Sequence, residues 1–374
     1  MNYAESRLER FFARWEFVTE HILCASDVDP YSLRELLALA DEDCAARWEG
    51  LTLGYTETCG HPMLREAIAG LYEKTSADGI VVCGGGAAEA LFLVTNILLE
   101  PGAHAVVVAP AFEPLYRVAA ALGAEVTLVP LDADTGWTLD LDAIRQAIRP
   151  RTEIITVNFP HNPTGALLDL GTFLGLVTLA EEQGITLVSD EVYRFMEFDP
   201  ARRLPAAADV SARAVSIGVM SKAYGLAGLR IGWVASADQD LLRRITALKD
   251  YTSVCSSAPS EILALIALRN HDRIVRRCKQ IVAGNLAHAD AFFSRWKKTF
   301  EWVRPEGGTV GFPRLVAPMP VDQFVSELVQ QEGVLLLPGT FFDDSDNRFR
   351  IGLGRRTLPV ALERLDGFVG RRLA

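Results

Sequence analysis

Short apolar runs rich in β-branched residues alternate with segments of helical periodicity over the middle of the chain. The runs predict strands, and the segments between them carry apolar residues three or four positions apart, as on one face of a helix. This alternation is typical of an α/β fold in which helices cover both faces of a mostly parallel sheet. The predicted strands are residues 80–83, 105–109, 125–130, 154–159, 186–189, 214–217 and 231–235, with helices over 87–99, 114–122 and 168–182.

The two ends of the chain have different patterns. Residues 8–15 carry apolar side chains at helical spacing, Asp29-Pro30 breaks the chain, and residues 33–40 again have helical spacing. Residues 260–295 predict one or two long helices, and shorter strands and helices follow them. We therefore predict an N-terminal segment (1–45) that packs with the small domain, a large domain (46–250) and a smaller α+β C-terminal domain (251–374).

Composition excludes several classes of protein. Hydrophobic residues make up 49% of the 374 residues and charged residues 23%. The net charge is -11 and the sequence has no stripe of basic residues, so we do not expect nucleic-acid binding. No apolar run approaches the ~20 residues of a membrane span, and the first residues do not have the pattern of a signal peptide. The six cysteines form no CxxC pair and no His/Cys cluster of zinc spacing, so we expect reduced thiols in a cytoplasmic protein without a metal site.

One lysine lies in a loop of small residues, Ser221-Lys222-Ala223-Tyr224-Gly225, and Arg230 follows eight positions later. Asp190 comes at the end of an apolar strand, where open α/β sheets bind their ligands. These three residue types can hold pyridoxal phosphate (PLP): the lysine forms a Schiff base, the acid pairs with the pyridinium nitrogen and the arginine binds the phosphate. The alternatives are a surface lysine and an aspartate that caps the next helix.

Other residues are candidates for contacts with the same cofactor. Asn162, in the rigid turn of residues 160–165, can reach the ring oxygen or a substrate carboxylate. Tyr193 can reach the ring oxygen. Gly84-Gly85-Gly86-Ala87-Ala88 joins a strand to a helix and offers free N–H groups for a phosphate, although a tight turn is an equal alternative. Phe112 follows a strand and can stack on a flat ring, or else belongs to the core.

Arg350 lies inside an apolar strand near the C-terminus, in Asn347-Arg348-Phe349-Arg350-Ile351. A buried arginine needs an anion, and the α-carboxylate of an amino acid would serve, held by two hydrogen bonds. An internal ion pair is the alternative.

Four motifs in combination resemble the class I/II aminotransferases, which are PLP enzymes of fold type I: N-P-T-G at 162–165, S-D-E-V-Y at 189–193, S-K-A-Y-G-L-A-G-L-R at 221–230 and F-R-I at 349–351. The resemblance runs from about residue 55 to 350. It implies a large domain with a mostly parallel seven-stranded sheet, a smaller α+β domain, and transamination between an amino acid and a 2-oxo acid. It also implies a homodimer with shared active sites and a place in amino-acid metabolism.

The resemblance assigns a role to each candidate. Lys222 would carry the Schiff base and move the proton at Cα. Asp190 would pair with the pyridinium, with Tyr193 and Asn162 at the ring oxygen and Phe112 stacked on the ring. The remaining roles are phosphate binding by Ala87, Ala88, Ser221 and Arg230, substrate carboxylate binding by Arg350, and contact with the neighbouring subunit's phosphate by Tyr55.

Two departures from the family pattern bear on the reaction. Val219 stands where many relatives have a serine or threonine that contacts the phosphate. Residues 24–32 replace the usual Gly-x-Pro and resemble a subgroup that includes capreomycidine synthase and the PLP-dependent arginine oxidases. That likeness implies a second reading, a lyase, cyclase or oxidase of arginine or a hydroxyarginine-like amino acid. Glu16, Asp27 and Asp29 would then face a cationic side chain, unless they are ordinary solvated acids.

Overall fold

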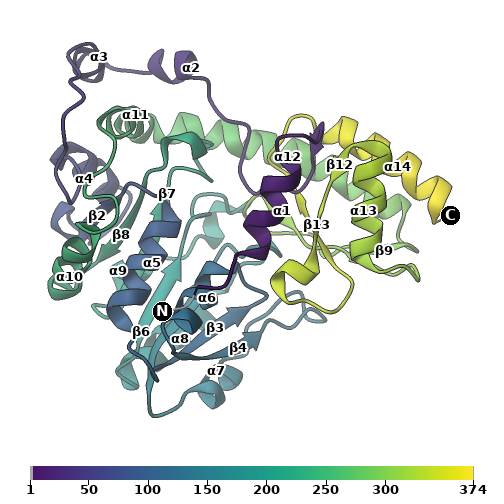
Figure 1. The fold of residues 1–374 in the computed structure, drawn as a ribbon, viewed down its shortest axis with the longest axis horizontal. Coiled ribbons are helices and arrows are strands. Elements are labelled where there is room, and N and C mark those ends of the chain that lie inside the picture. The colour runs from purple at the N-terminus through teal and green to yellow at the C-terminus, as the bar shows by residue number, and fades with distance from the viewer. Residues whose placement is uncertain (1–2, 374) are drawn as a thin grey trace.

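A seven-stranded sheet lies at the centre of the large domain in the computed structural model, which describes residues 3–373 (Figure 1). The strand order is β2-β8-β7-β6-β5-β3-β4. Strand β8 runs antiparallel to both of its neighbours, and the other pairs are parallel. The strands are β2 (Ile80–Cys83), β3 (His104–Ala109), β4 (Glu125–Pro130), β5 (Thr152–Asn158), β6 (Thr186–Asp190), β7 (Ala214–Val219) and β8 (Gly232–Ser236). The fold class and all seven strands are as predicted, with ends that agree to within about two residues.

Helices cover both faces of this sheet, which is why its inner strands read as continuous apolar runs. Successive residues of β3 show the alternation: Val106 and Val108 face one core, and Ala105 and Val107 face the other. One face packs against α5 (Ala87–Leu98), α6 (Pro114–Ala121) and α10 (Gln239–Lys249). The opposite face packs against α4 (Pro62–Ala69), α7 (Leu141–Ala147), α8 (Leu170–Glu182) and α9 (Ala207–Val210).

The small domain combines helices with very short strands. Its three-stranded sheet has the order β10-β14-β13, and phenylalanines such as Phe300, Phe324 and Phe349 pack together beside it. The segment 260–295 forms two helices, α11 (Ala258–Arg269) and α12 (His271–Arg295). The other elements are β9 (Phe300–Glu301), β10 (Val310–Gly311), β11 (Arg314–Leu315), α13 (Val321–Glu332), β12 (Val334–Leu335), β13 (Leu337–Pro338), β14 (Phe349–Gly352) and α14 (Leu358–Arg372).

The N-terminal segment runs past both domains. Helix α1 (Arg7–Trp15) lies near the boundary between them (Figure 1). Strand β1 (His21–Ile22) pairs in parallel with β12 of the small domain. Helices α2 (Leu33–Leu37) and α3 (Glu42–Glu49) instead pack against α11. The division of the chain at residues 45 and 250 stays a prediction.

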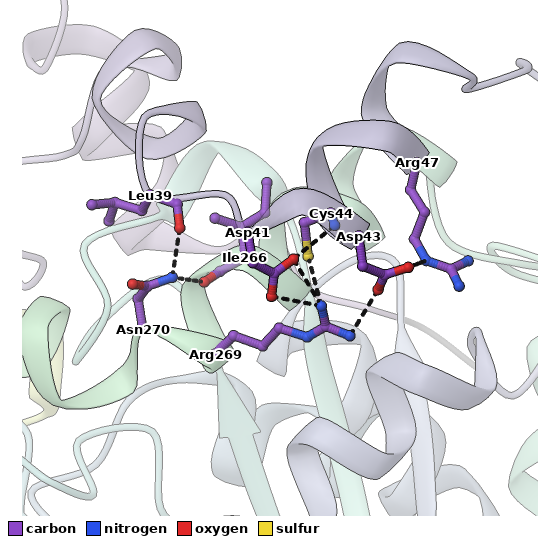
Figure 2. A network of polar contacts seen from close by, with 8 residues as sticks. All are labelled: Leu39, Asp41, Asp43, Cys44, Arg47, Ile266, Arg269 and Asn270. Carbon is purple, nitrogen blue, oxygen red and sulfur yellow. Dashed lines mark hydrogen bonds and ion pairs between the residues drawn. The ribbon is translucent and has the colours of Figure 1, made fainter.

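A network of polar contacts fixes α3 on α11 (Figure 2). The guanidinium of Arg269 donates to both carboxylate oxygens of Asp41, at 3.0 and 2.7 Å, and lies 3.0 Å from Asp43. The side-chain amide of Asn270 donates to the carbonyl of Leu39 at 3.0 Å. Because Arg269 neutralises Asp41 and Asp43, we interpret these two aspartates as part of an ion-pair network between the helices.

Short 3-10 helices lie at Ala77–Gly79, Pro200–Arg202, Ala227–Leu229 and Gly339–Phe342. Within residues 3–373, no helix is both long and apolar enough to cross a membrane.

Candidate active site

A cavity of about 410 Å³ lies at the carboxyl ends of three parallel strands. The last residues of β5, β6 and β7, which are Asn158, Asp190 and Val219, line it. This is where sheets of this kind bind ligands. Nearly all of the predicted site residues meet here: Glu16, Asp27, Ala87, Ala88, Phe112, Asn162, Asp190, Tyr193, Ser221, Lys222, Arg230 and Arg350. Two candidates from the sequence, Tyr55 and Asp29, do not line this cavity.

Lys222 follows β7 and is half-buried in the cavity wall. Its Nζ donates a hydrogen bond to Ser26 Oγ at 2.8 Å and lies 5.7 Å from the centre of the Tyr193 ring. The Tyr193 hydroxyl donates to the Ser26 carbonyl at 3.0 Å. Ser26 was not predicted, and it lies in the segment that departs from the family pattern.

Asp190 carries a buried carboxylate that has no ion-pair partner within residues 3–373. Asp190 is 4% exposed, and among the described residues the only hydrogen bond to its carboxylate comes from the backbone N–H of Val192 at 3.2 Å. Burial raises the pKa of Asp190 to about 7, although Val192 and Lys222 act in the opposite direction. A protonated ring nitrogen would supply the missing positive partner.

The start of α5 and the guanidinium of Arg230 lie together at the wall of the cavity. Gly86 precedes α5 with φ 74°, and a Cβ there would lie 2.9 Å from Arg230 Nη2. A Cβ on Gly232 would lie 2.6 Å from the Gly86 backbone, so glycine is required at both positions. Arg230 Nη2 donates to the Gly85 carbonyl at 2.9 Å, which holds the cation beside the free N–H groups of the helix. The structure therefore brings together the residues predicted to bind the phosphate, and that role stays a prediction.

Arg350 lies on β14 and is 2% exposed. Its Nε and Nη2 donate to the Cys24 carbonyl at 3.2 and 3.0 Å, and its Nη1 donates to Asn162 Oδ1 at 3.1 Å. Burial lowers the pKa of Arg350, yet an arginine stays charged. Within residues 3–373 these contacts leave one N–H on each terminal nitrogen, which is the pair that a carboxylate binds.

Asn158 joins the predicted residues to one another and was itself missed. Its Nδ2 donates to the Asp190 carbonyl at 2.8 Å, and its Oδ1 accepts from the Asn162 backbone N–H at 2.9 Å. It therefore sets the turn that carries Asn162 against the strand that carries Asp190. Its position near the end of the predicted strand 154–159 could have indicated a residue at the ligand-binding edge of the sheet.

The acidic residues of the N-terminal segment differ from one another. Asp27 pairs with Arg355 at 2.7 Å. Glu16 has no ion pair among the described residues, and burial, followed by the charge of Asp27, raises its pKa. Glu9, which was not predicted, also lines the cavity. Asp29 does not line the cavity. Its carboxylate contacts the Arg355 side chain and accepts from the backbone N–H of Arg356.

Tyr55 is 94% exposed and lines a second cavity, of about 600 Å³, formed by residues 43–64 and the start of α11. Its side chain is therefore free to reach beyond its own chain.

A family model for aminotransferase class I and II matches residues 32–365. The chain belongs to this family. It is therefore a PLP-dependent enzyme of the aminotransferase type. Capreomycidine synthase of Streptomyces vinaceus is 30% identical over 346 residues, which cover 92% of this chain and 88% of that protein.

Two solved structures resemble the fold over its whole length. A PLP-dependent aminotransferase from Streptococcus suis 89-1591 has a TM-score of 0.93 at 32% identity and covers 99% of both chains. A PLP-dependent cyclase, OrfR, has a TM-score of 0.90 at 28% identity and covers 100% of this chain and 98% of its own.

The residues present fit PLP. The unpaired carboxylate of Asp190 suits the pyridinium, and the start of α5 with Arg230 suits the phosphate. Lys222 is the lysine in this cavity that can bond to the aldehyde.

Proposed function

We propose that this enzyme transfers the amino group of an amino acid to a 2-oxo acid, with Lys222 as the cofactor-bonding lysine and the base at Cα. The observation that carries the proposal is the meeting of Lys222, Asp190, Arg230 and Arg350 around one cavity. These residues come from three separate parts of the chain, since Lys222 and Arg230 belong to one segment. Together they would hold the cofactor at three points and the substrate carboxylate at a fourth.

When bound, PLP supplies an electron sink for the negative charge that develops at Cα. Asp190 would pair with the ring nitrogen and favour its protonated form, on which the sink depends. Arg230, Ser221, Ala87 and Ala88 are proposed to bind the phosphate. Phe112 is proposed to pack against the ring, with Asn162 and Tyr193 near its oxygen.

Arg350 is proposed to orient the substrate through its two remaining N–H groups. Since the Cys24 carbonyl and Asn162 fix the guanidinium, the carboxylate meets a rigid pair of donors. Lys222 then needs to reach one proton at Cα. The hydrogen bond to Ser26 Oγ gives its amine a place at the cavity wall between proton transfers.

The substrate side chain is proposed to be cationic. Glu16 and Glu9 line the cavity from α1 and the residue that follows it, and neither has an ion-pair partner among the described residues. Burial and then the charge of Asp27 raise the pKa of Glu16, and a cation next to Glu16 would oppose both effects. The side chains of arginine and citrulline have nearly the same size and shape, but only that of arginine is charged. A comparison of the two substrates therefore separates the effect of charge from the effect of size.

The test compares arginine with citrulline as amino donors in the wild type and in Glu16→Gln. We expect kcat/KM for arginine to fall about tenfold or more in Glu16→Gln and that for citrulline to change little. Glu5→Gln is the matched control, because Glu5 is exposed, pairs with Arg10 and does not line the cavity. Equal losses for both donors would refute the role of Glu16.

The second candidate is a lyase, cyclase or oxidase of an arginine-like amino acid. The same acidic wall favours it, as does the likeness to capreomycidine synthase and to a PLP-dependent cyclase. A 2-oxo acid acceptor distinguishes the two candidates: transamination turns over only while an acceptor is consumed. Sustained turnover of arginine without an acceptor would select the second candidate.

The assembly is proposed to be a homodimer with shared active sites. Tyr55, Leu53 and Tyr251 are each at least four-fifths exposed, as expected for residues that a second copy covers. If Tyr55 serves the neighbouring site, a mixture of Tyr55→Phe and Lys222→Ala chains should regain activity, because one site of each hybrid is intact. No gain on mixing would contradict the shared site. All six cysteines are free thiols, which suits the proposed cytoplasmic location.

A further inference from the structure

Helix α1 forms one wall of the active-site cavity. Leu8, Glu9 and Phe12 line the cavity from this helix, and Glu16 lines it from the residue that ends it. The helix has 9 residues, which is shorter than the ~12 that an isolated helix needs to be marginally stable in water. Its position therefore depends on the contacts that dock it.

The large domain holds the start of α1 through one carboxylate. Glu113 is 3% exposed and accepts from Ser6 Oγ at 2.7 Å, from Arg7 Nε at 3.3 Å and from the Leu8 backbone N–H at 3.4 Å. The Ser6 hydroxyl accepts in turn from the Glu9 N–H at 3.2 Å and so caps the helix. Glu113 thus binds the cap, the first residue and a backbone group of α1 at once.

The small domain holds the same turn of α1. Arg7 Nη2 donates to Asp343 Oδ1 at 2.6 Å, and the Tyr116 hydroxyl of the large domain donates to Asp343 Oδ2 at 2.6 Å. Burial would raise the pKa of Asp343, but the hydrogen bonds from Tyr116 and Arg7 outweigh it and lower the pKa. The Phe11 ring lies 4.9 Å from the Phe341 ring. Helix α1 therefore spans the domain boundary, as Figure 1 shows.

We propose that Glu113 is a positioning residue for substrate recognition, because it docks α1 as a wall of the cavity through Ser6 and Arg7. We call the four residues Ser6, Arg7, Glu113 and Asp343 the clasp. Arg7 connects the clasp to the small domain through Asp343. Since Glu113 and Asp343 neutralise Arg7, the helix keeps an acidic surface toward the cavity. The effect on substrate rests on the proposed function, whereas the docking of α1 does not.

The experiment measures the docking of α1 and the binding of substrate separately. Trypsin cleavage after Arg10 and Arg14, which are exposed on α1, reports docking in the cofactor-free protein. Steady-state kinetics of the PLP-loaded enzyme give KM and kcat for the amino donor. The variants are Glu113→Gln, Arg7→Gln, their combination, and Asp209→Asn as the control.

Asp209 matches Glu113 because it is also buried and also accepts several hydrogen bonds, from the backbone N–H groups of Glu73, Lys74 and Thr75. It does not line the cavity or contact α1. A change that follows from general loss of stability should therefore occur in Asp209→Asn as well. Arg7→Gln breaks the clasp at an exposed residue, which keeps the test valid if Glu113→Gln folds poorly.

We expect cleavage on α1 and KM each to rise about tenfold in Glu113→Gln and in Arg7→Gln, with kcat within about twofold of the wild type. The double variant should be no worse than the stronger single variant, because both changes break one clasp. Unchanged cleavage and KM in both single variants would overturn the proposal, as would equal changes in Asp209→Asn. If no amino acid reacts, the proposed function fails while the cleavage result still decides the docking of α1.

Discussion

Asp190 should destabilise the folded protein whenever the cofactor is absent. Its carboxylate is buried and has no ion-pair partner in the part of the chain that the structure describes, and burial raises its pKa to about 7 from an ordinary value of 3.8. The folded state therefore binds more protons than the unfolded state between about pH 4 and pH 7. Stability must fall as the pH rises through that window, and the penalty is complete above it.

The size of the penalty follows from the same shift. About three pKa units at about 1.4 kcal/mol each give at most about 4 kcal/mol. Asp190→Asn removes the charge and keeps an oxygen that can accept from the Val192 N–H. The cofactor-free variant should be more stable than the cofactor-free wild type by about 2–4 kcal/mol near pH 8 and by little near pH 4.

Urea unfolding of both cofactor-free proteins at the two pH values measures this difference. Asp209→Asn is the control, since the hydrogen bonds to Asp209 outweigh its burial and lower its pKa. It should destabilise the protein near pH 8 and do so less at low pH. Equal stability of wild type and Asp190→Asn near pH 8, or a difference that does not vary with pH, would refute the reasoning.

Three further substitutions test the site. Lys222→Ala should lower turnover at least about a thousandfold, and borohydride should fix the cofactor to the wild type but not to the variant, as mass spectrometry would detect. Arg230→Gln should weaken PLP binding about tenfold to a hundredfold in a spectroscopic titration and leave the binding of pyridoxal, which has no phosphate, unchanged. Arg350→Lys should lower kcat/KM for every amino donor by about tenfold to a hundredfold, because lysine cannot donate two parallel hydrogen bonds; an unchanged value would exclude Arg350 as the carboxylate site.

The sheet could be predicted from the sequence because most of its strands are buried on both faces and the edge strand Glu125–Pro130 is flanked by clear turn residues. The runs at Ile80–Cys83 and Glu125–Pro130 have the predicted bounds, since turn residues flank each apolar run. The strands of the small domain are different. Pairs such as His21–Ile22 with Val334–Leu335 are two residues long, and only the folded chain brings them together.

The site was predictable where chemistry depends on a side chain at a strand end or in a short motif, as for Asp190 and Lys222. It was not predictable where a backbone atom or a distant residue does the work. Cys24 contributes its carbonyl oxygen to Arg350, and any residue type has one. Glu113 meets Ser6 across 107 positions of sequence, so no local pattern indicates their contact.

The most direct test of transamination is a half-reaction with the purified PLP-loaded protein and a single amino donor, arginine among those tried, without an acceptor. We predict that the visible cofactor band disappears, that each site releases one 2-oxo acid derived from the donor and then stops, and that an added 2-oxo acid restores the band. Continued product formation from arginine without an acceptor, or a band that no amino acid alters, would contradict the account.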